Sequence, residues 1–249
     1  MPPKVHIVRH AEGFHNCSKG GEGIHDPFLT EKGQEQCREL CSQFSEHDKI
    51  DLLMASPMKR TIQTCQTSFA PVVARGHKIL LMPLAQESSN EPMDTGSSEE
   101  QLKDTFGDLI DTSRLELFPY WHSNKGQFDT DGVSQIERAL HLRNVLKGRP
   151  EKNIVLVTHG SFAHFVAGNV NAEGKQMTRM WSNAECRTYK FADDDVHGDA
   201  RLVELQESID RRPDLEKEGD AFVWSLDSVK RGSAGNIHAT AGVVEAVKS

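Results

Sequence analysis

Two arginines and two histidines stand where predicted strands and helices of this chain meet its loops. Arg9 and His10 follow one short apolar run, His159 follows another, and Arg60 lies near the start of a predicted helix. A guanidinium group can form paired hydrogen bonds with phosphate oxygens, and a neutral imidazole can act as a covalent nucleophile. If the two strands are neighbours, these side chains can hold a phosphate beside a nucleophile. The pattern therefore predicts phosphoryl transfer.

Each of these groups has an expected role in that chemistry. Nearby guanidinium charges disfavour a protonated imidazole, so we expect His10 to be neutral and ready to attack phosphorus. His159 would donate a hydrogen bond to a phosphate oxygen. Glu87 follows the third predicted strand and is our choice for the acid that protonates the leaving group. Two arginines oppose a divalent cation, so we expect neither a metal nor another cofactor.

Strand and helix patterns alternate along most of the chain. Apolar runs predict strands at 4–8, 51–56, 79–82 and 154–158, with two more near 187–191 and 201–205. The intervening helical patterns favour an α/β fold. We expect a three-layer sandwich with a largely parallel central sheet flanked by helices. Residues 85–130, rich in polar and turn-forming types, would form an insertion over the C-terminal edge of the sheet.

Three helix starts can be predicted from capping residues. Thr30 is the expected N-cap of the helix that follows the first loop. Ser56 followed by Pro57 predicts the start of the helix that carries Arg60. Ser97 with Glu100 predicts a capping box inside the insertion.

The chain is expected to form one domain followed by a tail. Residues 1–206 contain the predicted strands and helices, whereas residues 207–249 mix charged residues with serine and glycine. We expect residues 207–249 to be a partly ordered C-terminal extension.

Composition limits the partners and the location of the protein. The formal charge of the 249 residues is −8, which argues against general binding to nucleic acid or to an anionic membrane. No stretch approaches the roughly 20 apolar residues of a membrane span, and the N-terminus lacks a secretory signal pattern. Five cysteines, an odd number, favour reduced thiols in the cytoplasm. The sequence makes no prediction of the oligomeric state.

Four blocks of the sequence resemble, in order, the motifs of the histidine phosphatase superfamily, also called the phosphoglycerate mutase-like family. They are residues 8–16, 26–33, 56–64 and 158–160. The resemblance spans residues 4 to about 168, and the segment Asp94-Thr95-Gly96-Ser97 is similar to fungal-type phosphatases of the superfamily. One departure is Ala11, where the family usually has glycine. A positive φ at that position would strain an alanine.

The resemblance implies a set of functional residues. It implies His10, His159 and Glu87 as catalytic residues, and Arg9, Arg60, Asn16 and His159 as ligands of the substrate phosphate. Further possible pocket residues are His15, Asp94, Gly160 and Ser161. Glu91 and Asp94 compete with Glu87 in the acid block, and Asp94 could line the pocket or share the acid role.

Three functions fit this interpretation. The first is a metal-independent phosphatase that hydrolyses a phosphorylated small molecule through a phosphohistidine on His10. The second is a phosphoglycerate mutase-type transfer to another hydroxyl, and the third is a catalytically weak protein that binds phosphorylated ligands. Residues 86–101 contain no lysine or arginine to clamp a second anionic group, so hydrolysis is favoured over the mutase reaction.

Overall fold

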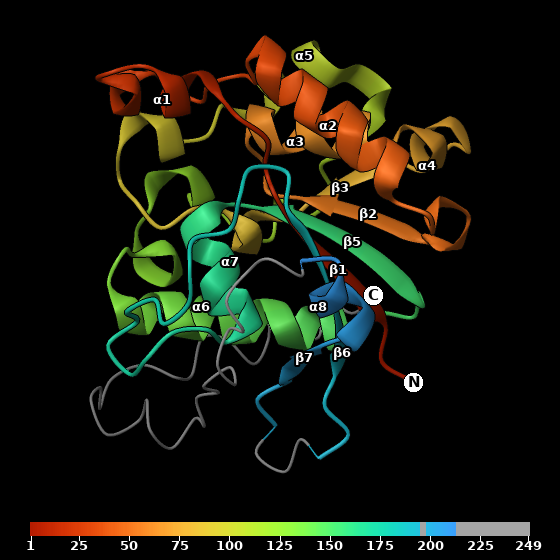
Figure 1. The fold of residues 1–249 in the computed structure, drawn as a ribbon. Coiled ribbons are helices and arrows are strands. Elements are labelled where there is room, and N and C mark those ends of the chain that lie inside the picture. Colours follow the sequence, from red (N-terminus) through yellow and green to blue (C-terminus); the bar gives the residue numbers. More distant parts are fainter. Residues whose placement is uncertain (195–197, 213–249) are drawn as a thin grey trace.

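A single mixed sheet runs through the part of the chain that the computed structural model describes, residues 1–194 and 198–212 (Figure 1). Its strands are β1 (Lys4–Arg9), β2 (Leu52–Ala55), β3 (Ile79–Leu81), β4 (Ile110–Asp111), β5 (Asn153–Thr158), β6 (Cys186–Phe191) and β7 (Leu202–Glu204). They lie in the order β4-β3-β2-β5-β1-β6-β7. The first five in this order are parallel, and β6 and β7 are antiparallel additions. The predicted α/β fold with a largely parallel sheet is confirmed.

Helices cover both faces of the sheet. They are α1 (Phe14–Cys17), α2 (Glu31–Gln43), α3 (Lys59–Ser68), α4 (Ala70–Ala74), α5 (Glu99–Phe106), α6 (Gly132–Lys147), α7 (Gly160–Ala167) and α8 (Gln206–Asp210). Figure 1 shows α2, α3 and α4 on one side of the sheet and α6 and α7 on the other. The apolar run 154–157 of β5 is fully buried between these layers, as expected for a strand covered on both faces.

The parallel register of β1 and β5 decides where the two histidines lie. Arg9 of β1 is the partner of Thr158 of β5, and the His10 amide donates to the Thr158 carbonyl at 2.9 Å. Both strands therefore end at the same level, and His10 and His159 leave the sheet side by side. β2 flanks β5 on the other side, so the loop from β2 to α3 reaches the same edge.

Asp26 explains why two of the three expected helix starts are wrong. Thr30 caps α2 as predicted, since its hydroxyl accepts from the Gly33 amide at 3.0 Å. α3, however, begins at Lys59, whose amide donates to the Asp26 carboxylate at 2.9 Å. The Ser97 hydroxyl donates to the same carboxylate at 2.7 Å. A side chain distant in sequence thus supplies the acceptor that local capping rules assign to a neighbouring serine.

The capping box of the insertion lies one residue later than predicted. α5 begins at Glu99, and its box is formed by Ser98 and Gln101 instead of Ser97 and Glu100. The insertion also contains β4, a two-residue strand that pairs with β3 and gave no apolar pattern of its own. Such a short strand takes its structure from the sheet edge on which it lies.

The predicted C-terminal extension begins with an ordered helix. Residues 207–210 belong to α8, whose Ser208 is buried and accepts a hydrogen bond from the Thr188 amide of β6 at 2.9 Å. This first turn is ordered, and the partly ordered extension over residues 207–249 stays a prediction. The remainder of the predicted extension, from residue 213, lies outside the described residues.

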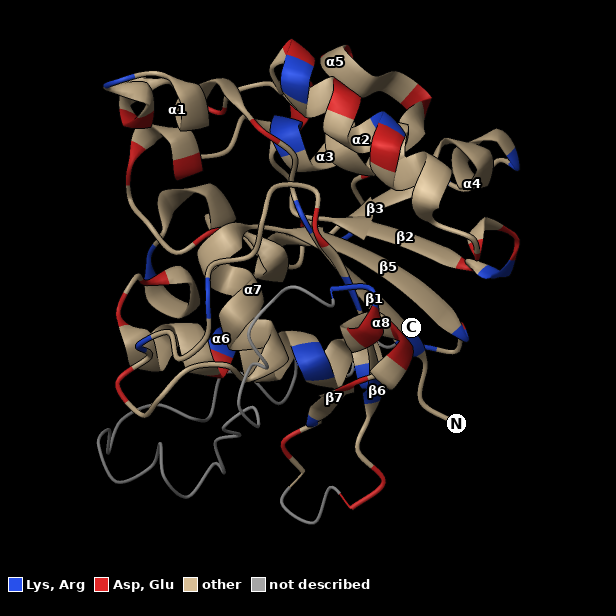
Figure 2. Cartoon of the chain, viewed as in Figure 1, with Lys and Arg blue, Asp and Glu red and all other residues tan. Residues whose placement is uncertain are grey.

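Figure 2 shows charged residues of both signs distributed along the chain, and α2 carries both signs. All five cysteines are free thiols. Within residues 1–194 and 198–212, no helix combines the length and the apolar character needed to cross a membrane. The cytoplasmic location and the absence of nucleic-acid and membrane partners stay predictions.

Candidate active site

His10 is a buried imidazole with one ring nitrogen already engaged. Its Nδ1 lies 2.7 Å from the carbonyl oxygen of Ala11, and its side chain is almost completely buried. A carbonyl only accepts, so Nδ1 carries the proton and Nε2 keeps its lone pair. Burial first, and then the charges of Arg60 and Arg9, hold the pKa of His10 well below its ordinary value. His10 is therefore a neutral imidazole with an unprotonated Nε2.

Arg9 and Arg60 are both tied to the backbone but keep part of their donor capacity. Arg9 donates through Nη1 to the Trp181 carbonyl. Arg60 donates through Nη1 to the Met93 carbonyl at 2.6 Å and through Nη2 to the Asp94 carboxylate at 2.7 Å. The Nε of each arginine is buried and has no hydrogen-bond partner among the described residues. Each arginine thus has a buried N–H that no described residue uses.

His159 packs against His10 with both of its ring nitrogens occupied. The two ring centroids are 5.2 Å apart, and His159 is completely buried at the N-cap of α7. Arg60 donates to its Nδ1 at 3.0 Å, so Nε2 must carry the proton and donate to the Ser56 hydroxyl at 2.8 Å. The expected hydrogen bond from His159 to a phosphate oxygen would require the bond to Ser56 to break.

Glu87 places its carboxyl group against the first turn of α7. Its oxygens accept from the backbone amides of Ser161 at 3.2 Å and Phe162 at 3.0 Å, and from the adjacent Ser88 amide at 3.0 Å. These bonds and Arg60 favour the charged form, but burial and the charge of Asp94 outweigh them and raise the pKa of Glu87. Glu87 therefore keeps a proton to a higher pH than an ordinary glutamate.

Asp94 and Glu91, the two competing acids, differ in position. Asp94 is buried, and its carboxylate accepts from Arg60 and from the Ser89 hydroxyl. Glu91 is exposed at the edge of the same loop. Asp94 therefore lies in the cluster as the ion-pair partner of Arg60.

The remaining predicted residues lie at different depths. The His15 ring is 5.4 Å from His10, and burial, Arg60 and Arg9 lower its pKa to about 3. A Cβ on Gly160 would approach Arg9 Nε to 3.0 Å, so glycine leaves room for that guanidinium. Asn16 is exposed on α1, where its side chain accepts from the Gly13 amide at 3.0 Å. The structure thus brings His15 and Gly160 to the cluster, and Asn16 stabilises the start of α1.

Ala11 fits its position without strain. It is fully buried, and the non-glycine residues with positive φ in the described part of the chain do not include it. Its amide donates to the Thr64 hydroxyl of α3 at 3.0 Å. The departure from the usual family glycine is therefore compatible with the loop.

The sequence analysis missed Arg138, a fully buried arginine of α6. Its Nη2 donates to the Glu87 carbonyl at 3.0 Å, and its guanidinium lies 3.9 Å from the centroid of the Phe162 ring. Burial lowers its pKa to about 9. The one available signal was its place among Ile136, Ala139 and the other apolar positions of that helix. Arg138 links α6 to the loop that begins with Glu87.

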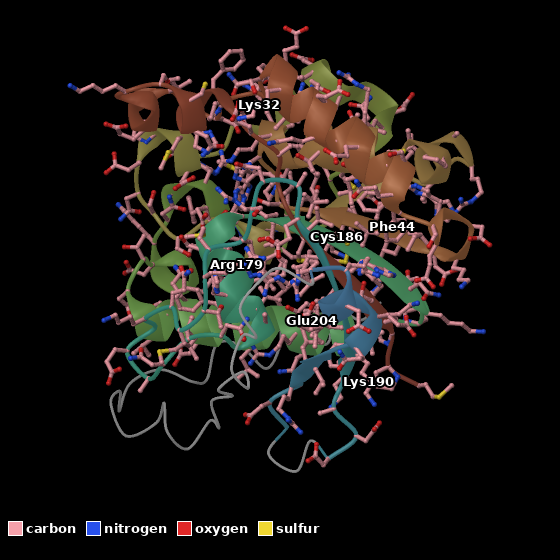
Figure 3. All side chains as sticks on the ribbon, in the orientation of Figure 1. Lys32, Phe44, Arg179, Cys186, Lys190 and Glu204 are labelled. Atoms are coloured by element: carbon pink, nitrogen blue, oxygen red, sulfur yellow. The ribbon has the colours of Figure 1, made fainter. Side chains whose placement is uncertain are left out.

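A separate cavity of about 520 Å³ lies beside the sheet, and its lining includes Phe44, Arg179 and Cys186, which are labelled in Figure 3. None of the residues predicted for the site lines it. Its wall nevertheless contacts the loop that carries His10, because the Asn183 side chain donates to the His10 carbonyl at 3.1 Å.

Strands β1, β2 and β5 of this α/β sandwich end in a cluster of histidines, arginines and carboxyl groups. Open α/β sheets bind their ligands at this edge, beyond the carboxyl ends of the strands. The sequence profile of the histidine phosphatase superfamily (branch 1) matches residues 5–200. The chain therefore belongs to the histidine phosphatase superfamily.

Relatives of the chain have names that fit this family. A probable phosphatase of Schizosaccharomyces pombe is 26% identical over 159 residues, which cover 63% of this chain and 73% of that protein. A phosphoglycerate mutase-like protein of Arabidopsis thaliana is 25% identical over 228 residues, covering 76% of this chain and 84% of its own. A mycobacterial glucosyl-3-phosphoglycerate phosphatase shares the fold, with a TM-score of 0.53, 16% identity, and coverage of 82% of this chain and 97% of that one.

Proposed function

We propose that this protein is a phosphatase that hydrolyses phosphate monoesters of small molecules through a phosphohistidine on His10, without a metal ion. The observation that supports this most strongly is the free Nε2 of a neutral, buried His10 beside two arginines with unpartnered Nε groups. A nucleophile and two cationic donors are what an in-line displacement at a phosphate requires.

The reaction has two steps. In the first, the lone pair of His10 Nε2 forms a bond to phosphorus as the bond from phosphorus to the ester oxygen breaks, and Glu87 gives its proton to that oxygen. In the second, water loses a proton to the Glu87 carboxylate and attacks phosphorus, and the phosphorus–nitrogen bond breaks. Arg9 and Arg60 balance the charge on the phosphate oxygens in both steps. Neutral His10 and protonated Glu87 are regenerated.

Labelling and turnover test this mechanism directly. The native protein should release phosphate from 4-nitrophenyl phosphate in the presence of EDTA, and vanadate should inhibit it. His10→Ala should lose at least about 10³-fold in kcat, because no other nucleophile replaces the imidazole. His77→Ala, a histidine in the loop before β3, is the matched control and should keep native turnover.

The covalent intermediate separates this proposal from the alternatives. Rapid acid-free quenching with ³²P-labelled substrate should give a base-stable, acid-labile adduct in the native protein and none in His10→Ala. Unchanged turnover in His10→Ala would refute the mechanism. Phosphate recovered at a new hydroxyl of the substrate would indicate a mutase, and binding without turnover would indicate a phosphate-binding protein.

A further inference from the structure

Arg60 and Asp94 form a buried ion pair next to His159. The Asp94 carboxylate accepts from Arg60 Nη2 at 2.7 Å, and the two side chains are 2% and 1% exposed. The other carboxylate oxygen accepts from the Ser89 hydroxyl. Both oxygens of Asp94 are therefore engaged as acceptors, and its carboxylate is the partner of a buried cation.

The loop that carries Asp94 is braced so that this carboxylate stays near Glu87. The Asn124 side-chain amide donates to the Ser89 carbonyl at 2.8 Å and to the Asp94 carbonyl at 3.4 Å. Asn124 in turn accepts from Gln86 at 2.8 Å. The buried side chain of Asn124 thus forms hydrogen bonds with both ends of the segment from Gln86 to Asp94. This segment carries both Glu87 and Asp94.

The charges that face Glu87 come from several elements. Arg9 of β1, Arg60 of α3 and Arg138 of α6 all interact with it and favour its charged form. The first backbone amides of α7 do the same. Asp94 acts in the opposite direction, and with burial it raises the pKa of Glu87. Removing the negative charge of Asp94 would leave Glu87 among cations and amide donors.

Building on the proposed function, we propose that Asp94 is a positioning residue that holds Arg60 beside His159 and keeps the proton on Glu87 until the leaving oxygen takes it. Asp94 itself transfers no proton. As the bond from phosphorus to the leaving oxygen breaks, the proton passes from Glu87 to that oxygen, and Asp94 remains the anionic partner of Arg60.

The test removes the charge and keeps the shape. In Asp94→Asn the side-chain oxygen still accepts from Arg60, so Arg60 stays in place. With benzyl phosphate, whose alkoxide leaving group needs a proton, kcat should fall by about 10–100-fold, part of the roughly 10²–10⁴-fold that a general acid contributes. With 4-nitrophenyl phosphate, whose leaving group is a weak base, the loss should stay below about 3-fold. The alkaline limb of the benzyl phosphate pH profile should move to lower pH.

Two comparison variants show which changes in turnover and in the pH profile are specific to Asp94. Glu87→Gln should abolish the alkaline limb, because it removes the acid itself. Glu91→Gln, an exposed acid of the same loop, should behave like the native protein. An equal loss on both substrates with an unshifted profile in Asp94→Asn would reduce Asp94 to a structural residue. Loss of the alkaline limb in Asp94→Asn would make Asp94 the acid, and either result overturns the proposal.

A titration separates this proposal from the proposed function. The side-chain carboxyl of Glu87, followed by ¹³C NMR in the substrate-free protein, should titrate at lower pH in Asp94→Asn than in the native protein or in Glu91→Gln. This readout needs no turnover, so it decides the effect of Asp94 on Glu87 even if neither ester is hydrolysed. An unchanged titration would overturn the proposal.

Discussion

The Arg60–Asp94 pair allows a quantitative test of the structure, because a buried charge without its partner is costly. We consider Arg60→Met, which replaces the guanidinium with an apolar chain of similar length. The variant leaves the Asp94 carboxylate, 2% exposed, with the Ser89 hydroxyl but without its cation. It also removes donors from the Met93 carbonyl and from His159.

The expected change in the free energy of unfolding follows from the interactions that Arg60→Met removes. Breaking a buried ion pair by removing one partner typically costs about 3–5 kcal/mol, mostly because the remaining charge is uncompensated. We therefore expect Arg60→Met to lower the free energy of unfolding by about 3–5 kcal/mol. Adding Asp94→Asn neutralises the stranded charge, so the double variant should recover about 1–3 kcal/mol of that loss, within the usual range of coupling energies.

The assay is urea denaturation of the native protein, both single variants and the double variant, with the m-values checked for constancy. The matched control is the same cycle on Arg38 and Glu35, an ion pair on α2 whose side chains are 56% and 71% exposed. Its coupling energy should be below about 1 kcal/mol. Additive losses at Arg60 and Asp94, with a cycle no larger than that of the exposed pair, would refute the buried pair and the reasoning built on it.

Two further predictions concern the stability of parts of the fold away from His10. Gly33→Ala should destabilise the protein by about 1–3 kcal/mol, because the new Cβ would lie 2.1 Å from the Glu12 carbonyl oxygen. Gly23→Ala, whose Cβ would meet nothing within 4 Å, is the control and should change thermal stability little. Burial lowers the pKa of His6 from 6.5 to about 4, so below pH 6.5 the unfolded chain takes up a proton before the folded one. The free energy of unfolding therefore has the full contribution of His6 above pH 6.5 and loses it as the pH falls to about 4. The shift in pKa corresponds to a loss of about 3 kcal/mol. His6→Asn should flatten that part of the curve of unfolding free energy against pH, and an unchanged slope would contradict the assignment.

Features that depend on short-range pattern could be predicted from the sequence. The apolar runs before Arg9 and before His159 indicated two buried strands, and parallel neighbours must end at one edge of the sheet. The register of β1 and β5 follows that expectation. Thr30 could also be identified as a helix cap, because its partner Gly33 lies three residues away.

Contacts between distant residues could not be predicted in the same way. Asp26 lies 33 residues before Lys59 and 71 before Ser97, yet its carboxylate holds both. Nothing in the local sequence indicates that Ser56 is used by His159 instead of by the helix start. Asp26 also has a left-handed backbone, with φ of 40°, a conformation that is uncommon for non-glycine residues. Specific polar contacts of this kind depend on the assembled fold.

The carboxylate of Asp94 offsets part of the positive charge of Arg9 and Arg60. With His10 and His159 neutral, Arg9 and Arg60 set against Asp94 leave a small positive excess beside His10, and Arg138 contacts the backbone of Glu87. A bound phosphate dianion would reverse that excess and add a second negative neighbour for Glu87. Because nearby negative charge favours the protonated form of a carboxyl group, phosphate binding and protonation of Glu87 should reinforce each other. The form of the protein that holds the ester is then also the form that can protonate its leaving group.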